Sequence, residues 1–204
     1  MSERALVGSD LVDLTDRDNL ASFARPGYLE RVCTPQERCA LASSSEPSRR
    51  FFELFAAKEA AHKLLVKLGE EPGFSYQRIE IRADLGSARY RGYELALELD
   101  GSHDWVHVVA GVGAARVRRE VAALVDLVGA KDPSEATRLL LRRLAARVTG
   151  LSFDELAIER RPLAGSWDGF APPSLLASGE PTDIDVSLSH DGRFVAAALV
   201  VPPA

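Results

Sequence analysis

The sequence predicts an α+β protein made of two similar subdomains, each a small antiparallel sheet with packed helices. Its 204 residues suit one large domain or two small ones. Each half contains helical segments followed by strands, and each ends on an apolar strand-like segment, at 106–113 (VHVVAGVG) and 194–201 (FVAAALVV). We therefore expect subdomains at residues 1–114 and 115–204.

Composition and charge argue against several classes of protein. Hydrophobic residues make up 46% of the chain and charged residues 27%, which is typical of a globular protein with its own core. The formal charge of -5 argues against nucleic-acid binding, which favours a basic face. Cys33 and Cys39 have no zinc-ligand spacing around them. No signal-peptide pattern opens the chain, and no apolar run approaches the roughly 18 residues of a membrane span. We expect a cytoplasmic protein that binds neither nucleic acid nor membrane.

The first half is expected to hold a strand, polar helical fragments, a long helix and then three strands. Residues 4–14 predict a strand interrupted by Gly8 and Asp10. Thr15 and Thr34 are candidate N-caps of short helices. The long helix covers 51–69 and ends at Gly69, a C-cap signal. Alternation and turn residues then predict strands at 75–84, 85–99 and 104–113.

The second half is expected to open with two helices and close with strands. Residues 114–129 and 132–150 predict helices, the second starting at Asp132-Pro133. A strand is expected within 154–163, and a loop over 164–183 with at most a short strand at 174–177. Residues 184–201 predict two strand segments around a turn at 189–192.

The long helix carries ionisable groups on an otherwise apolar surface. Glu59 and Lys63 lie about 40° apart around it, on one stripe with Phe52, Phe55 and Val66. The pair should therefore be partly buried, and a buried carboxylate needs a partner or a metal. A structural ion pair is the alternative interpretation.

Two further polar residues stand out at strand ends. Asp10 interrupts an apolar strand, either as a carboxylate at the edge of a crevice or as a cap for a backbone group. His190 follows Ser189 where a strand meets a turn, either as a phosphate ligand or as an ordinary satisfied side chain. Taken together, Asp10, Glu59, Lys63 and His190 would suit Mg²⁺ and a phosphate group.

Three stretches resemble the 4'-phosphopantetheinyl transferase superfamily: VGSDLVDL at 7–14, FFELFAAKEAAHKLL at 51–65 and VSLSHDGRFVAAALV at 186–200. They match its G-x-D strand motif, its KEA helix with a second Lys after the Glu, and its S-H turn. In the larger type of this superfamily two units are fused as a pseudo-dimer. Here the G-x-D and KEA unit comes first, so the chain resembles a pseudo-dimer with its halves in exchanged order.

The resemblance implies a reaction and a site. Phosphopantetheine would pass from coenzyme A to a serine of an acyl or peptidyl carrier protein, with release of 3',5'-ADP. The first half would bind Mg²⁺ through Asp10 and Glu59, and Glu59 and Lys63 would act in catalysis. The second half would bind the nucleotide end of coenzyme A. The residues implied to bind coenzyme A are Lys58, Arg138, Ser189 and His190.

The sequence departs from the superfamily pattern at two positions. The larger type often has a metal-binding carboxylate where this chain has Val12, which leaves the third metal ligand open, with Asp13 a further candidate. The small type often has an Arg where this chain has Leu54. Both departures concern the grip on the metal and coenzyme A.

Several alternatives stay open at this point. The chain could be a catalytically silent member that only binds a carrier protein, or a Mg²⁺-dependent phosphohydrolase. The carrier could serve fatty acid, polyketide or peptide synthesis. A fused pair is expected to act as a monomer. The expected docking face for an acidic carrier is the region after the first strand, with residues Arg17, Phe23, Arg25, Tyr28, Leu29, Arg31 and Arg38.

Overall fold

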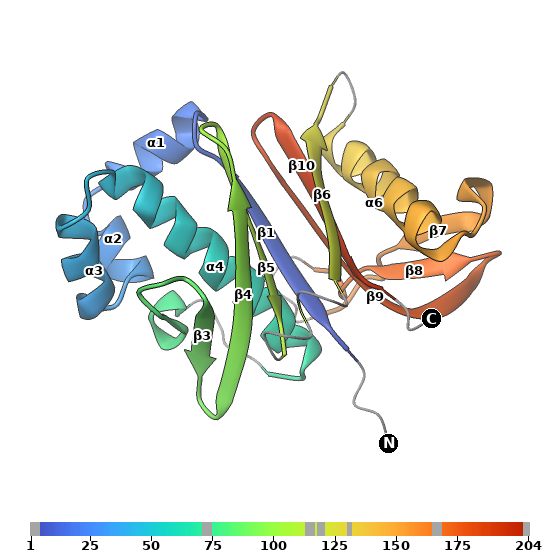
Figure 1. Cartoon of the computed structure of the whole chain (residues 1–204), viewed down its shortest axis with the longest axis horizontal. Helices are drawn as coiled ribbons and strands as arrows, with labels where there is room; N and C mark the ends of the chain where they lie inside the picture. The colour runs from blue at the N-terminus through green and yellow to red at the C-terminus, as the bar shows by residue number, and fades with distance from the viewer. Residues whose placement is uncertain are drawn as a thin grey trace.

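The computed structural model is built from two five-stranded antiparallel sheets, each packed against a long helix (Figure 1). The structure describes residues 5–70, 75–112, 117, 121–129, 132–164 and 169–201. The two sheets have the same type of strand order, β1-β5-β4-β3-β2 and β6-β10-β9-β8-β7. This arrangement confirms the expected α+β fold of two similar halves. The expected boundary between residues 114 and 115 lies outside the described residues.

The first sheet packs its inner face on the longest helix, α4 (Pro47–Lys67). Its strands are β1 (Val7–Asp13), β2 (Glu80–Ile81), β3 (Ser87–Tyr90), β4 (Tyr93–Gly101) and β5 (Trp105–Gly111). Alternate residues of β5, such as Val106 and Val108, join α4 in the larger hydrophobic core. β1 forms the edge of this sheet and faces the second half.

Three short helices connect β1 to α4. They are α1 (Arg17–Phe23), α2 (Tyr28–Val32) and α3 (Pro35–Ala42). Asp16 caps α1, and Thr34 forms a reciprocal capping box with Glu37 at the start of α3. The long helix begins at Pro47, earlier than expected, and Gly69 adopts a left-handed φ of 85° just beyond its end.

The second half repeats the pattern with the long helix α6 (Pro133–Thr149). Its strands are β6 (Val121–Leu127), β7 (Leu156–Glu159), β8 (Ser174–Ala177), β9 (Glu180–Asp191) and β10 (Phe194–Val200), with the 3-10 turn η2 (Phe153–Glu155) before β7. Asp132 caps α6 by accepting a hydrogen bond from the backbone of Glu135, and Gly150 ends it in the left-handed conformation. The predicted helix at 132–150 and the hairpin around residues 189–192 are confirmed.

Three expected elements differ from the structure. The helix expected at 114–129 is wrong over its second part, because residues 121–127 form β6 and pair with β10. The strand expected at 85–99 is a hairpin of β3 and β4, with Arg91 at a φ of 50° in its turn. The segment 75–84, expected as one strand, contains the 3-10 turn η1 (Tyr76–Arg78) and only the two-residue strand β2.

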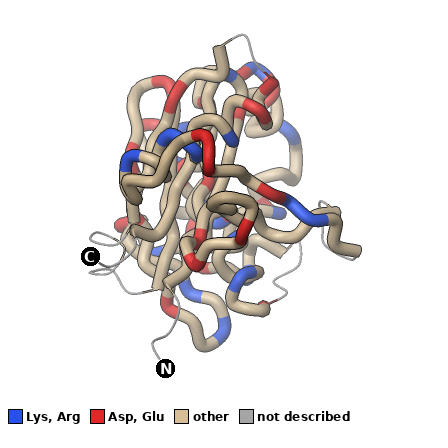
Figure 2. Tube along the Cα trace, turned by 90° about the vertical axis from the view of Figure 1, so that its right-hand side faces the viewer, with Lys and Arg blue, Asp and Glu red and all other residues tan. Residues whose placement is uncertain are grey.

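The two halves pack face to face through β1, β9 and β10. Leu11 of β1 joins Phe194 and Ala196 of β10 in a small cluster, and Val7 joins Ala198 in another. Acidic and basic side chains are interspersed along the chain in the view of Figure 2. Cys33 is buried, Cys39 is exposed, and neither forms a disulfide. Within the described part of the chain, the search for a helix suited to spanning a membrane finds none.

Candidate active site

A cleft of about 970 Å³ opens between the two halves. α4 and β1 form its wall on the first half, while the start of α6, the end of β9 and the segment before β8 form the wall on the second. This volume lies near the upper end of the range of about 300–1,000 Å³ that is typical of small-molecule binding sites. Six of the seven residues predicted for the site line it: Asp10, Glu59, Lys63, Arg138, Ser189 and His190.

The edge of β1 is closed by side chains from β9 rather than by another strand. Backbone N–H groups of four alternate residues of β1 each donate to a side-chain oxygen of the residue 178 positions later. The pairs are Val7 with Asp185 (2.7 Å), Ser9 with Ser187 (2.8 Å), Leu11 with Ser189 (3.1 Å) and Asp13 with Asp191 (2.7 Å). We call these four hydrogen bonds the side-chain ladder. An open strand edge would leave these donors unpaired, so the ladder fixes the register of the two halves.

Two lysines of α4 continue this junction. Lys63 donates to the carbonyl oxygens of Ser9 (2.9 Å) and Leu188 (3.3 Å) and pairs with Asp10 at 2.8 Å. Lys67, one turn later, donates to the carbonyl oxygens of Val7 and Val186 and pairs with Asp185 at 2.8 Å. Lys63 therefore stands where both halves and the cleft meet.

Asp10 and Glu59 form a carboxylate pair in the cleft. Asp10 lies on the α4 side of β1, where its Oδ1 accepts hydrogen bonds from Lys63 and from Ser189 (2.9 Å). Burial raises the pKa of Glu59, and the negative charge of Asp10 raises it further. The Tyr76 hydroxyl donates to Oε1 of Glu59 and partly offsets this effect.

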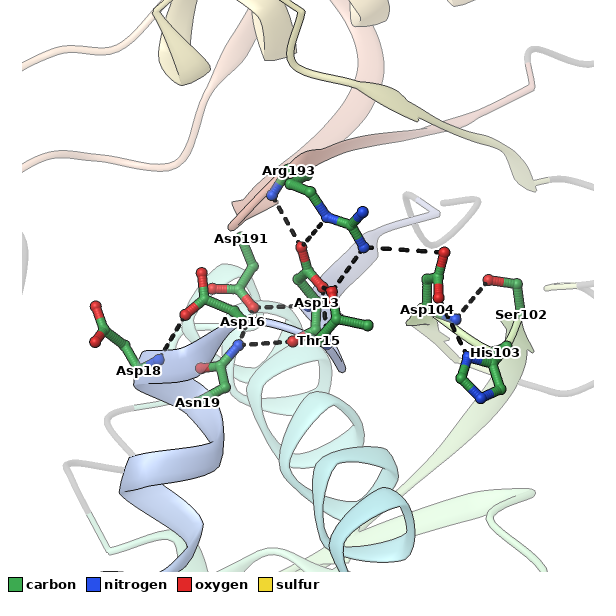
Figure 3. A network of polar contacts seen from close by, with 10 residues as sticks. All are labelled: Asp13, Thr15, Asp16, Asp18, Asn19, Ser102, His103, Asp104, Asp191 and Arg193. Carbon is green, nitrogen blue, oxygen red and sulfur yellow. Dashed lines mark hydrogen bonds and ion pairs between the residues drawn. The ribbon is translucent and has the colours of Figure 1, made fainter.

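A polar network connects both halves, and two of its members, Asn19 and Asp191, line the cleft (Figure 3). Asp13 accepts hydrogen bonds from the backbone and side chain of Thr15 and from the backbone (3.0 Å) and Nε (3.2 Å) of Arg193. Burial alone would raise the pKa of Asp13, but these hydrogen bonds outweigh it and lower the pKa below its usual value. Asn19 of α1 links the Asp13 carbonyl to the carboxylate of Asp191. The network holds the β9–β10 turn, next to His190, against the end of β1.

The opposite wall is suited to an anion. Arg138 lies in the first turns of α6, and its side chain is exposed beside Ser134 and Thr137 in the cleft. His190 is also exposed there. The N-terminus of a helix favours negative charge, and a guanidinium binds phosphate oxygens well. This wall combines both features.

Residues 6–123 match the sequence model described as the 4'-phosphopantetheinyl transferase superfamily. The chain belongs to this superfamily. The match covers the G-x-D strand and the KEA helix, so it contains Asp10, Glu59 and Lys63.

Relatives of the superfamily match parts of the chain. A holo-[acyl-carrier-protein] synthase of Shewanella loihica is 41% identical over 68 residues, which are 33% of this chain. The chain spans about half the length of that curated relative (50%). A holo-[acyl-carrier-protein] synthase structure from Neisseria meningitidis is 21% identical, covers 52% of this chain and 96% of its own, and has a TM-score of 0.43. The corresponding enzyme of Thermotoga maritima is 16% identical, covers 86% and 83%, and has a TM-score of 0.40.

One superfamily motif residue lies away from the cleft. The structure fully buries Lys58 on another side of α4, where its Nζ pairs with Glu37 at 2.9 Å. The same Nζ donates to the carbonyl oxygens of Tyr76 and Ile79. Lys58 was expected to bind coenzyme A, and the structure does not bring it together with the other six residues.

The two acidic residues of the superfamily motifs suit a divalent cation. Burial and the negative charge of Asp10 both raise the pKa of Glu59, and a cation held by the two carboxylates would offset that negative charge. Among the described residues, no group of three or more His, Cys, Asp or Glu side chains could hold a metal. A cation at Asp10 and Glu59 would therefore take its other ligands from substrate and water, as Mg²⁺ commonly does. Asp13, the further candidate, turns to Thr15 and Arg193 instead.

Sequence reasoning missed three contributors to this superfamily site. Tyr76 contacts Glu59, Lys67 joins the halves, and Ser187 supports β1. One signal was available: Asp or Ser occupies every second position from Asp185 to Asp191, alternating with Val186, Leu188 and His190. Such a row of acceptors on one side of a strand indicates a face that meets backbone donors.

Proposed function

We propose that the chain transfers 4'-phosphopantetheine from coenzyme A to a serine of an acyl or peptidyl carrier protein and releases 3',5'-ADP. The observation that carries this proposal is a cleft lined by Asp10, Glu59 and Lys63 from the first half and by Arg138 and His190 from the second. Membership of the 4'-phosphopantetheinyl transferase superfamily and the similarity to a holo-[acyl-carrier-protein] synthase support it.

Coenzyme A would be held by both halves. Asp10 and Glu59 would hold Mg²⁺ beside the pyrophosphate, where the bound ion supplies charge neutralisation. Arg138, His190 and the start of α6 would bind the 3'-phosphate of the nucleotide, because a guanidinium, an imidazole and a helix N-terminus lie together there. In this proposal residues 1–114 form the metal-binding subdomain, and residues 115–204 bind the nucleotide.

The chemical step exchanges one phosphorus–oxygen bond for another. The hydroxyl oxygen of the carrier serine forms a bond to the β-phosphorus of coenzyme A, and the bond from that phosphorus to the oxygen of 3',5'-ADP breaks. The proton of the serine hydroxyl passes to Glu59 or to a water molecule in the cleft. Lys63 donates hydrogen bonds to the pyrophosphate oxygens as the leaving group gains negative charge, which requires it to exchange part of its contact with Asp10 for the substrate.

The test is mass spectrometry of an apo carrier protein incubated with coenzyme A, Mg²⁺ and the full chain. We expect the carrier to gain the mass of one phosphopantetheine arm, and Glu59→Ala to slow this gain by at least about 100-fold. Glu94→Ala, which removes an exposed carboxylate on β4, is the matched control and should act like the wild type. Carrier binding without a mass gain would indicate a silent family member, and consumption of coenzyme A without a carrier would indicate a phosphohydrolase. Either result rejects the proposal.

A further inference from the structure

Glu59 accepts a hydrogen bond from Tyr76, a residue that is not part of the cleft lining. The hydroxyl of Tyr76, in the 3-10 turn η1, donates a hydrogen bond to Oε1 of Glu59. The Tyr76 ring packs against Phe55, with the ring centroids 5.8 Å apart, and this contact fixes the direction of the hydroxyl. No hydrogen bond joins the other oxygen, Oε2, to a described residue. Tyr76 therefore orients the carboxylate and leaves one oxygen for the cleft.

The turn that carries Tyr76 is held in place by Lys58. A 3-10 turn of three residues has little stability of its own. Nζ of Lys58 donates to the carbonyl oxygen of Tyr76 at 3.0 Å and to that of Ile79 at 2.6 Å. These two oxygens belong to the first residue of η1 and to the residue just after it, so Lys58 ties both ends of the turn to α4.

Lys58 is itself fixed by Glu37 of α3. The carboxylate of Glu37 pairs with Nζ of Lys58 at 2.9 Å and accepts hydrogen bonds from the backbone of Ile81 (3.0 Å) and Thr34 (2.8 Å). An ammonium group has three protons to donate, and here all three have acceptors. The buried lysine is thus fully satisfied, with no donor remaining for a ligand.

Stability alone does not account for this arrangement. A buried ion pair is often no more stabilising than an apolar side chain of similar volume. Lys58 is the residue directly before Glu59 on α4, and the backbone it holds carries the hydroxyl that contacts Glu59. Lys58 thus contacts the backbone of Tyr76, the Tyr76 hydroxyl contacts Glu59, and Glu59 is bonded to Lys58 along the chain.

We propose that Lys58 and Tyr76 are positioning residues for Glu59: Lys58 holds the η1 turn against α4, and the turn presents the Tyr76 hydroxyl to the carboxylate. This role rests on the proposed function, since it assigns the motif lysine to the carboxylate that holds the divalent cation. Groups that contact a metal ligand typically change metal affinity by about 10- to 100-fold when removed.

The test measures Mn²⁺ binding to the full chain by electron paramagnetic resonance, without coenzyme A or carrier. We expect Tyr76→Phe to weaken Mn²⁺ binding about 10-fold. Its melting temperature should change no more than that of the control variant Tyr93→Phe, each measured against the wild type. Lys58→Met should weaken binding by a similar factor. The double variant should bind Mn²⁺ no more weakly than the single variant with the lower affinity, because both substitutions remove the same support of Glu59.

Three results would overturn the proposal. The first is Mn²⁺ affinity in Tyr76→Phe equal to that of the wild type, which decides the matter even if Lys58→Met lowers stability. The second is a double variant whose losses multiply, because the two residues then act independently. The third is Mn²⁺ binding that survives Glu59→Ala, which removes the cation site itself. The carrier assay described above judges the transfer reaction separately, so the two failures can be told apart.

Discussion

Gly8 allows α4 to approach the strand that carries Asp10. A Cβ atom at position 8 would lie 2.2 Å from the carbonyl oxygen of Ala60 and 2.8 Å from the backbone nitrogen of Leu64. Both atoms belong to the helix backbone, which cannot move away as a side chain could. The glycine of the G-x-D motif is therefore a packing requirement: it sets the separation between β1 and α4, and with it the place of Asp10 next to Lys63.

Gly8→Ala is expected to lower the free energy of unfolding by about 3 kcal/mol or more, because the helix must shift to admit one methyl group. Denaturant unfolding measures this change. Gly92→Ala is the matched control, since a Cβ there meets no atom within 4 Å. An equal and small effect in both variants would contradict the packing argument.

His107 is a buried base on the face where the halves meet. It pairs with Leu11 across β1 and β5, and its Nε2 has no hydrogen-bond partner among the described residues. Burial lowers its pKa from 6.5 to about 4. In the unfolded chain His107 therefore binds a proton below pH 6.5, whereas in the folded chain it binds one only below about pH 4.

Stability should fall as the pH decreases through this window, and His107 should contribute up to about 3 kcal/mol of the loss between pH 6.5 and 4. His107→Leu removes the titrating group and should flatten the curve of unfolding free energy against pH. Above pH 6.5 the His107 side chain is neutral in both the folded and the unfolded protein. The curves of the wild type and of His107→Leu should therefore run parallel there. Identical slopes for both proteins between pH 4 and 6.5 would show that the His107 pKa is not lowered.

Individual site residues were predictable where a motif marked them, and less so where only position in space matters. Asp10 and Glu59 each interrupt an apolar pattern, His190 follows Ser189 in the S-H turn motif, and all three line the cleft. Lys58 shares the KEA motif with Glu59 but lies 100° further back around the helix, so it faces another side. Tyr76 lies 17 residues after Glu59 in a short turn, and no periodicity connects the two.

At the scale of elements, the side-chain ladder allows an edge strand to be buried between two halves. Its four hydrogen bonds satisfy donors that would otherwise lie unpaired in the interface. Ser187 is buried, accepts a hydrogen bond from the backbone of Ser9 and lines the cleft two residues before Ser189.

Ser187→Ala should lower the free energy of unfolding by about 1–3 kcal/mol, because it leaves the N–H of Ser9 buried without an acceptor. Thermal or denaturant unfolding tests this. Ser174→Ala removes an exposed hydroxyl on β8 and should have little effect. If the two variants are equally stable, the ladder does not hold the halves together.

Elements with strong local signals were predicted well, and elements decided by pairing were not. The ends of α6 follow from Asp132, Pro133 and Gly150, all of which act locally. The sequence of β6 predicts a helix, because Ala122 and Ala123 favour helices and the segment has no strict alternation. Its strand conformation depends on antiparallel pairing with β10, more than 60 residues away, which the segment alone does not encode.

At the scale of the whole molecule, the two halves share one fold, but only the first half has the acidic residues of the candidate site. β1 and β6 are both seven-residue edge strands, paired with β5 and β10 in the same way. Asp10 is the fourth residue of β1, and the fourth residue of β6 is Leu124, which packs on the second core. The second half thus has an apolar side chain where the first half has a metal-binding candidate.

This asymmetry predicts one functional site per chain and no need for a second copy. The cleft already draws residues from both halves, so association of two chains would complete nothing further. Light scattering should give a monomer of about 22.1 kDa, and calorimetric titration with coenzyme A and Mg²⁺ should give one site per chain. Leu124→Asp restores a carboxylate to β6 but not the rest of a site, so it should lower stability without adding a second binding event. A stable dimer whose dissociation abolishes coenzyme A binding would mean that the site is built between chains and not between the two halves of one.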